Sequence, residues 1–413
     1  MNLTLSPTHL RGSVTPPPSK SSSHRLLIAA ALASGESTIE NFLPSEDLTA
    51  TVRALRSLGA EIHENGSTLH ISGIASRSVR PNDLPHLDCG ESGSTLRFLI
   101  PVALAVAGGG VFHGSKRLLE RPLQPYFDIF QNQGIEYTLS DDTLTIRGKL
   151  LPGKYHLPGN VSSQFFSGLF FALPLLGAPS VIIPDGHMES FSYIGMTLHT
   201  LSQFGIHIPS TLSIPPQYHI PSDVRYLPGH FRVENDWSQA AFWYAAHGIG
   251  NAVTMVGMNT DSLQGDRAIL DYGAQIQRGG FVSIDISDCP DLAPPLAVWG
   301  ALMSGEMHLV GAARLRMKES DRLASITRAL AALGADIREG ADSLSIRGKD
   351  HLRGGAVVNC ENDHRIAMML AIAATRCEQP ITLLDAQCVN KSYPHFWRDY
   401  ASLGGIIHEH AGQ

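Results

Sequence analysis

Cysteine is scarce in this sequence, and its distribution excludes a disulfide framework. The 413-residue chain has five cysteines, at Cys89, Cys289, Cys360, Cys377 and Cys388. Their number is odd and no C-x-x-C pair occurs, so the pattern of a small secreted scaffold is missing. Unpaired cysteines are typical of a reducing compartment. We therefore expect a cytoplasmic protein.

Long hydrophobic runs are also missing. The longest apolar stretches lie at residues 98–112, 168–179 and 292–305, and each contains Pro and Gly. All fall short of the roughly 18 apolar residues that indicate a membrane-spanning helix. The first eleven residues lack the basic segment and apolar core of a signal peptide. We expect buried helices of a soluble protein and no membrane partner.

Positive charge is in deficit. Lys plus Arg number 31 against 38 Asp plus Glu, which gives a net charge of −7. A globally acidic chain is a poor nonspecific binder of nucleic acid, so no nucleic-acid partner is expected. Local basic clusters can still oppose the net charge and bind small anions. The 19 histidines include no H-E-x-x-H motif, and no metal site is predicted.

A repeat organises the residues that are present. Six helical stretches end in Gly, and an apolar residue or Tyr follows three positions later. The pairs are Gly59/Ile62, Gly134/Tyr137, Gly205/Ile208, Gly273/Ile276, Gly334/Ile337 and Gly404/Ile407, at spacings of 75, 71, 68, 61 and 70 residues. Gly stands where a left-handed residue would end each helix. Units of this length are longer than those of common solenoids, which favours a closed α/β unit used six times.

Periodicity supports this interpretation. Apolar residues with helical spacing precede three of the glycines, at Leu48/Val52/Leu55/Leu58, Ile194/Leu198/Leu201/Phe204 and Leu323/Ile326/Leu330/Leu333. Alternating hairpins are predicted after three copies, at residues 60–71, 135–146 and 335–346. A Pro-, Ser- and Tyr-rich break at residues 209–229 separates three copies from three. Two similar lobes are therefore expected.

Seven basic residues stand in polar clusters at predicted helix starts and loops. Taken alone, each cluster is explained as well as, or better than, an anion site by a capped helix start, a plain turn or a solvated surface. The segment 109–116 resembles a nucleotide-binding P-loop, but Ser115 occupies the position of the required Lys, so no ATP site is predicted. Taken together the clusters favour a cleft between lobes that binds highly anionic small molecules. The seven cations are Lys20, Arg25, Arg121, Lys318, Arg322, Arg365 and Lys391.

These clusters carry a resemblance to a known family. From about residue 20 to residue 393 the chain resembles the 5-enolpyruvylshikimate-3-phosphate synthases, or 3-phosphoshikimate 1-carboxyvinyltransferases. The matching segments are Pro18-Ser19-Lys20-Ser21 with Arg25, Leu119-Glu120-Arg121-Pro122, Ser162-Ser163-Gln164, Lys318-Glu319-Ser320-Asp321-Arg322 and Asn362-Asp363-His364-Arg365. They occur in the family's order and at similar spacing.

The resemblance implies the fold class and the domain boundaries. The implied class is α/β, as a two-lobed inside-out α/β barrel with three βαβαββ repeats in each lobe, the enolpyruvyl transferase fold. Residues 19–228 would form the N-terminal lobe, mainly on the shikimate 3-phosphate side. Residues 1–18 with 229–413 would form the C-terminal lobe, mainly on the phosphoenolpyruvate side. The first strand would thus belong to the C-terminal lobe, and the lobes would close over the substrates.

The resemblance also implies the reaction. The enolpyruvyl group of phosphoenolpyruvate would move to the 5-hydroxyl of shikimate 3-phosphate, with release of phosphate, through a tetrahedral intermediate. This step belongs to the shikimate pathway, which leads to chorismate and the aromatic amino acids. The chemistry requires no cofactor, and a monomer is expected. The two substrates carry roughly −5 to −6 charges, which the seven cations would match.

Site residues follow from the resemblance position by position. Shikimate 3-phosphate would be bound by Lys20, Ser21, Arg25, Ser162, Ser163, Gln164, Ser190, Tyr193, Asp291 and Lys318. Phosphoenolpyruvate would be bound by Lys20, Gly93, Arg121, Gln164, Arg322, Arg365 and Lys391. Asp291 is expected to act as base toward the 5-hydroxyl and Glu319 as proton shuttle at the methylene carbon. Lys20 and Lys391 would stabilise the leaving phosphate, and His364 would tune Glu319.

The sequence departs from the family pattern at three positions. Glu91 replaces a common Asn and Ser94 a common Thr in the Gly-rich turn, and Arg314 replaces an Asn that binds shikimate 3-phosphate. Glu91 would repel an anion unless it were turned away or paired, for example with Arg97. Two alternative functions remain open. One is UDP-N-acetylglucosamine enolpyruvyl transferase, disfavoured because the loop 114–120 lacks that family's usual Cys. The other is a noncatalytic scaffold that binds anions.

Overall fold

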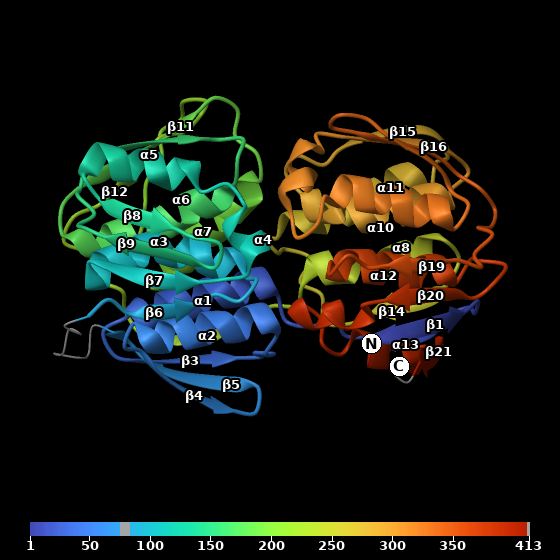
Figure 1. Ribbon diagram of the computed structural model, residues 1–413, viewed down its shortest axis with the longest axis horizontal. Helices are drawn as coiled ribbons and strands as arrows, with labels where there is room; N and C mark the ends of the chain where they lie inside the picture. The colour runs from blue at the N-terminus through green and yellow to red at the C-terminus, as the bar shows by residue number, and fades with distance from the viewer. Residues whose placement is uncertain (75–82, 411–413) are drawn as a thin grey trace. The chain divides into compact units, whose positions relative to one another are not determined.

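The computed structural model describes residues 1–74 and 83–410 (Figure 1). The chain forms two compact units. The N-terminal unit comprises residues 18–234, and the C-terminal unit comprises residues 1–17 and 235–413. Each unit packs around a buried apolar core of its own. The expected division, at residues 18/19 and 228/229, differs from these boundaries by one and six residues.

The described residues of the N-terminal unit form three sheets. Two are four-stranded, in the orders β13-β3-β5-β4 and β6-β7-β9-β8, and the third is β10-β11-β12. The strands are β3 (Glu36–Glu40), β4 (Glu61–Asn65), β5 (Thr68–Ser72), β6 (His86–Asp88), β7 (Gly109–His113), β8 (Glu136–Leu139), β9 (Thr143–Arg147), β10 (Lys154–Pro158), β11 (Ser180–Asp185), β12 (Tyr218–Ile220) and β13 (His230–Arg232).

The C-terminal unit also contains three sheets among its described residues. Their orders are β19-β20-β1-β21, β15-β16-β18-β17 and the two-stranded β14-β2. The strands are β1 (Asn2–Ser6), β2 (Arg11–Val14), β14 (Ala252–Met255), β15 (Gly280–Asp285), β16 (Gly305–Val310), β17 (Asp336–Glu339), β18 (Leu344–Arg347), β19 (Val357–Asn359), β20 (Ile381–Leu384) and β21 (Ile406–His410).

All four-stranded sheets share one pattern of strand directions. In each, the first two strands are parallel and the two following pairings are antiparallel. The predicted hairpins are confirmed as β4–β5, β8–β9 and β17–β18. The first strand of the chain, β1, completes the sheet of β20 and β21, so Figure 1 shows it in blue among red strands. The first strand of the chain therefore lies in the C-terminal unit.

The helices contribute many of the buried apolar side chains in the core of each unit. In the N-terminal unit they are α1 (Lys20–Leu32), α2 (Glu46–Ser57), α3 (Gly93–Ala107), α4 (Lys116–Leu119), α5 (Gln124–Gln133), α6 (Ser163–Ala172) and α7 (Phe191–Gln203). In the C-terminal unit they are α8 (Trp237–Gly248), α9 (Ile269–Ile276), α10 (Ala293–Ala301), α11 (Arg322–Ala332), α12 (His364–Ala374) and α13 (Phe396–Ser402). Helices α10 and α12 are buried along their whole length, as expected for helices that are apolar on every side.

The glycines at the helix ends follow the sequence pattern with one exception. A left-handed backbone is found at Gly59, Gly134, Gly205, Gly334 and Gly404, where a side chain would be strained. The prediction for Gly273 is wrong, because this residue lies inside α9 and the helix continues to Ile276. Gly279, with φ +70°, follows the end of that helix instead. Gly273 lies against the ring of Trp299, so its small size serves helix packing.

Candidate active site

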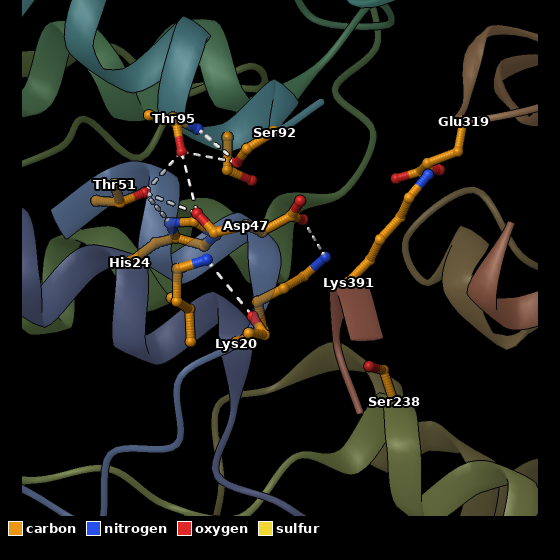
Figure 2. Close-up of polar contacts among 12 residues, drawn as sticks. Lys20, His24, Asp47, Thr51, Ser92, Thr95, Ser238, Glu319 and Lys391 are labelled. Atoms are coloured by element: carbon orange, nitrogen blue, oxygen red, sulfur yellow. Dashed lines mark hydrogen bonds and ion pairs between the residues drawn. The ribbon is translucent and has the colours of Figure 1, made fainter. Parts of the chain in front are cut away.

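Lys20 is the first residue of α1 and is held by a carboxylate from α2. Its Nζ lies 2.8 Å from Oδ2 of Asp47, and both side chains are largely buried (Figure 2). The hydroxyl of Ser19 caps the helix by accepting from the backbone N–H of Ser22. Because the start of a helix carries partial positive charge, an ammonium there is disfavoured. Asp47 offsets this cost and fixes the position of the cation.

Arg25 lies about one turn further along α1 and is buried. Three oxygen atoms accept hydrogen bonds from its guanidinium group and fix its orientation. Its Nε donates to Oγ1 of Thr197 at 2.8 Å, and its two terminal nitrogens donate to the carbonyls of Ser21 and Tyr193 at 2.8 and 3.0 Å. The guanidinium also lies over the Tyr193 ring. Burial lowers the pKa of Arg25 to about 10. The group therefore stays positive at neutral pH, suited to gripping a phosphate.

Gln164, in the first turn of α6, is oriented by α3. Its Oε1 accepts from Arg97 at 3.0 Å, and its Nε2 donates to Oγ of Ser94 at 3.0 Å. Arg97 also donates to the carbonyl of Pro122. The amide of Gln164 is thus fixed in orientation, because its oxygen faces a cation and its nitrogen faces a hydroxyl. Glu91 is exposed at the turn before α3.

The remaining predicted residues of the N-terminal unit stand mostly at helix starts. The hydroxyl of Ser162 caps α6 by accepting from the N–H of Gln164, and Ser163 begins that helix. Ser190, which is buried and has a left-handed backbone, directly precedes α7. Helix starts present unsatisfied N–H groups and favour anions. The guanidinium of Arg121 approaches the start of α3 at Gly93.

Asp291 is the centre of an ion-pair cluster in the C-terminal unit. It lies in the short helix η4 (Pro290–Leu292), directly before α10. Its carboxylate oxygens lie 2.8 Å from Arg365, 3.0 Å from Arg322 and 3.5 Å from Nζ of Lys318. Three cations from three segments thus converge on one carboxylate. Such a cluster can exchange its internal partners for an anionic ligand.

Arg322 is buried and forms ion pairs with three carboxylates. Besides Asp291, its guanidinium lies 2.9 Å from Asp363 and 2.5 Å from Glu319. Ser320 also donates to Asp363, at 3.1 Å. Arg322 is 1% exposed and Asp363 is 0% exposed. A buried charge is tolerated only when it is paired and hydrogen-bonded, and these contacts meet that requirement.

The cluster shifts the acidity of its members. Burial alone would raise the pKa of Asp291, but the positive charges of Arg365, Lys318 and Arg322 outweigh it and hold that pKa well below the usual range. Burial lowers the pKa of Lys318 to about 8, against the opposing pull of Asp291. Asp291 is therefore ionised at neutral pH. Lys318 is mostly charged at pH 7 and neutral well above pH 8.

Lys391, the last residue of the short helix η6 (Ala386–Lys391), is tied to the turn before α12. Its Nζ donates to the carbonyl of Asn362 at 2.6 Å. Asn362 has φ +53°, a left-handed conformation that non-glycine residues rarely adopt. Arg365, which follows in α12, also donates to Oγ of Ser238 at 3.1 Å. His364 is buried at the first position of the same helix.

Comparison with known proteins identifies the family. The family model for EPSP synthase (3-phosphoshikimate 1-carboxyvinyltransferase) matches residues 5–400. The chain belongs to this family. The 3-phosphoshikimate 1-carboxyvinyltransferase of Clostridium novyi is 43% identical, with 99% of this chain and 98% of the relative covered. That of Clostridioides difficile is 42% identical at the same coverage.

Solved structures of the family share the fold. EPSP synthase from Acinetobacter baumannii superposes with a TM-score of 0.80 at 24% identity, and the match covers 99% of this chain and 100% of that one. A second structure of that enzyme gives the same TM-score at 23% identity. The mixed α/β architecture of two units is therefore that of EPSP synthases, and the resemblance read from the sequence motifs is confirmed.

The site residues that the family resemblance predicts for this chain form separate groups in the two units. In the C-terminal unit Asp291, Lys318, Glu319, Arg322 and Arg365 form one continuous cluster. In the N-terminal unit α1 carries Lys20, Ser21 and Arg25, and Arg25 is linked to α7 through Thr197 and the Tyr193 carbonyl. Arg314, which departs from the family pattern and is not among the predicted binding residues, donates to the carbonyl of Ser287 at 2.5 Å.

Sequence reasoning missed the residues that hold the predicted ones in place. These are Asp47, Arg97, Ser238 and Asp363, which contact Lys20, Gln164, Arg365 and Arg322 respectively. Asp363 lies inside a recognised motif, but nothing in the motif pairs it with Arg322. Asp47, 27 residues from Lys20, gives no sequence signal beyond an acidic first turn of α2.

Two further observations bear on the class of protein. No helix in the described part of the chain combines the length and apolar character needed to span a bilayer. Across residues 1–74 and 83–410, no group of three or more His, Cys, Asp and Glu side chains could hold a metal ion. The five cysteines are buried and unpaired as thiols.

Proposed function

We propose that this chain transfers the enolpyruvyl group of phosphoenolpyruvate to the 5-hydroxyl of shikimate 3-phosphate and releases phosphate. The ion-pair cluster around Asp291 carries this proposal, because it places a carboxylate and three cations together on a chain of the EPSP synthase family. The reaction lies in the shikimate pathway, which leads to aromatic amino acids. We further propose a cytoplasmic monomer, consistent with the five unpaired thiols.

Shikimate 3-phosphate is assigned mainly to residues at helix starts of the N-terminal unit. Arg25 is held in a fixed orientation and is charged at neutral pH, and its guanidinium group can bind a phosphate through two parallel hydrogen bonds. Hydroxyl and amide groups near helix starts supply further hydrogen bonds to the phosphate and the sugar-like ring. The proposed contacts are Lys20, Ser21, Arg25, Ser162, Ser163, Gln164, Ser190 and Tyr193, with Asp291 and Lys318 from the C-terminal unit.

We assign phosphoenolpyruvate mainly to arginines and lysines whose side chains contact carboxylates or backbone carbonyls of the protein in this structure. Arg322 and Arg365 lie against Asp291, Lys20 against Asp47, and Lys391 against the Asn362 carbonyl. An anionic substrate would replace these internal contacts in part. The proposed set is Lys20, Gly93, Arg121, Gln164, Arg322, Arg365 and Lys391, with Lys20 and Lys391 stabilising the phosphate that leaves.

Asp291 and Glu319 are proposed to move the protons. In the addition step the 5-hydroxyl oxygen attacks C2 of phosphoenolpyruvate, its proton passes to Asp291, and Glu319 delivers a proton to the methylene carbon. In the elimination step that carbon returns a proton to Glu319, the C2–O bond to phosphate breaks, and the proton held by Asp291 leaves with the phosphate. His364 is proposed to tune Glu319.

The acidity of Asp291 must change for it to serve as base. In the cluster its pKa is held low by Arg365, Lys318 and Arg322, and a carboxylate in that state binds a proton weakly. The substrates bring negative charge to the same cations. Their approach reduces the field on Asp291, raises its pKa and makes it a better proton acceptor when both substrates are bound.

A phosphate-release assay with phosphoenolpyruvate and shikimate 3-phosphate tests the proposed function. We expect release with this pair and none when UDP-N-acetylglucosamine replaces shikimate 3-phosphate. Release only with the nucleotide sugar would instead indicate the sister transferase, and no release with either would indicate a binding scaffold. Asp291→Ala tests the base assignment, which is wrong if the folded variant keeps near-normal kcat.

A further inference from the structure

A buried chain of hydrogen bonds joins helices α1, α2 and α3 of the N-terminal unit. Nδ1 of His24 lies 2.8 Å from Oγ1 of Thr51, which lies 2.6 Å from Oγ1 of Thr95, which donates to Oγ of Ser92 at 2.7 Å (Figure 2). All four residues are at most 1% exposed. The chain therefore runs from α1 through α2 to the cap of α3 without direct access to water.

His24 sets the direction of this chain. Burial lowers the pKa of His24 well below its ordinary value, and the charges of Lys20 and Arg25 act in the same direction, so the imidazole is neutral. Its Nε2 is buried and has no hydrogen-bonding partner among the described residues. A buried N–H without an acceptor is rarer than an unused acceptor. The proton is therefore best placed on Nδ1, where Thr51 accepts it.

The tautomer of His24 determines which hydroxyl group donates at each further step of the chain. Because Thr51 accepts from His24, its own proton can be donated to Thr95 at 2.6 Å, a shorter contact than the 3.3 Å to the Asp47 carbonyl. Thr95 in turn donates to Ser92. Ser92 also accepts from the backbone N–H of Thr95 at 3.2 Å, as the cap of α3. Both acceptor positions of Ser92 are thus used, and its orientation is fixed.

The chain borders two residues assigned to phosphoenolpyruvate. Ser92 directly precedes Gly93, and Asp47, whose carbonyl lies 3.4 Å from the Thr95 hydroxyl, holds Lys20 through its carboxylate. We propose that the chain from His24 to Ser92 is a positioning device that fixes Gly93 and Lys20 relative to each other for phosphoenolpyruvate. This inference rests on the proposed function and adds residues that do not touch the reacting atoms.

Isosteric substitutions test the device. Thr51→Val and Thr95→Val remove one hydroxyl each and preserve shape, and Thr95→Ser retains the hydroxyl. The control is Thr200→Val in α7, which removes a buried hydroxyl bonded only to the carbonyl of Met196 among the described residues. Steady-state kinetics with each substrate varied, and the melting temperature of every variant, are measured.

We expect Thr51→Val and Thr95→Val to raise KM for phosphoenolpyruvate about five- to tenfold, the effect of one lost buried hydrogen bond. KM for shikimate 3-phosphate should change less than about twofold, and Thr95→Ser should restore most of the loss. Kinetics equal to those of Thr200→Val, or an equal rise in both KM values, would overturn the proposal.

A second measurement separates this inference from the proposed function. Nitrogen NMR of histidine-labelled protein reports the tautomer of His24, and His24→Asn assigns its signal among the 19 histidines. We expect the proton on Nδ1, and a shifted signal in Thr51→Val but not in Thr200→Val. A proton on Nε2 would refute the chain. This result tests the hydrogen-bond chain without turnover. Failure of the wild type to release phosphate would instead refute the proposed function, and with it the role of the chain in phosphoenolpyruvate binding, while the NMR result would still stand.

Discussion

The guanidinium group of Arg121 occupies the space that a side chain on Gly93 would need. A Cβ atom at position 93 would lie 2.6 Å from Nη1 and 3.0 Å from Cζ of Arg121. Both distances are shorter than van der Waals contact. Gly93 is therefore required by the position of the arginine, since its own backbone is helical and unstrained.

Gly93→Ala should weaken phosphoenolpyruvate binding with little effect on folding. The guanidinium is the end of a flexible side chain, so it can move aside at small cost in stability but leaves its binding position. We expect KM for phosphoenolpyruvate to rise about tenfold or more, roughly 1.4 kcal/mol, with the melting temperature nearly unchanged.

A double-mutant cycle checks the cause of this effect. If Gly93→Ala acts through Arg121, it should add little to the loss already produced by Arg121→Ala. Additive losses would show that the methyl group acts directly on the substrate or on the turn before α3.

The activity should fall as the pH rises through about 8. Burial lowers the pKa of Lys318 to about 8, so the free enzyme loses this positive charge above that pH. Because kcat/KM reports groups of the free enzyme, kcat/KM for shikimate 3-phosphate should decline on the alkaline side, toward tenfold lower for each further pH unit at most. Lys318→Arg keeps its charge in this range. Its profile should be lower overall but flat across pH 8, and a decline retained in this variant would assign the titration to another group.

Asp363→Asn should destabilise the C-terminal unit strongly. The substitution keeps an oxygen that can cap α12 but leaves the buried Arg322 with less opposing charge. Breaking a buried pair costs about 3–5 kcal/mol. As a control, Glu306→Gln breaks the exposed pair with Arg347, whose partners are 42% and 68% exposed, and should cost less than about 1 kcal/mol. Urea unfolding followed by tryptophan fluorescence compares the two, and equal costs would contradict the argument.

Local features of the fold could be predicted because short segments determine them. The hairpins β4–β5, β8–β9 and β17–β18 followed from alternation with turn residues between, and the faces of α2, α7 and α11 followed from helical spacing. The serines and aspartates at helix starts could likewise be read as caps, and Ser92, Ser162 and Asp363 cap their helices.

Partners that are distant in sequence could not be predicted in this way. Asp363 lies 41 residues from Arg322, and Asp291 lies 74 from Arg365. Periodicity states which face of a helix is apolar but not which charged group of another segment packs beside it. The family resemblance supplied the positions of Asp291, Arg322 and Arg365, whereas their mutual ion pairs come from the structure alone.

Gly273 shows the same limit and gives the last prediction. The sequence pattern placed it after a helix, but it lies within α9, where a Cβ would be 2.7 Å from Cη2 of the buried Trp299 ring. In an open helix Gly→Ala stabilises by about 0.5–1 kcal/mol. Here the indole cannot move without disturbing the core, so Gly273→Ala should destabilise by about 1–3 kcal/mol. Gly195→Ala in α7, where a Cβ meets no atom of the described residues within 4 Å, is the matched control and should be neutral or stabilising. The unfolding midpoints of the two variants test this prediction. A gain in stability for Gly273→Ala would show that the Trp299 ring leaves room for a side chain at position 273.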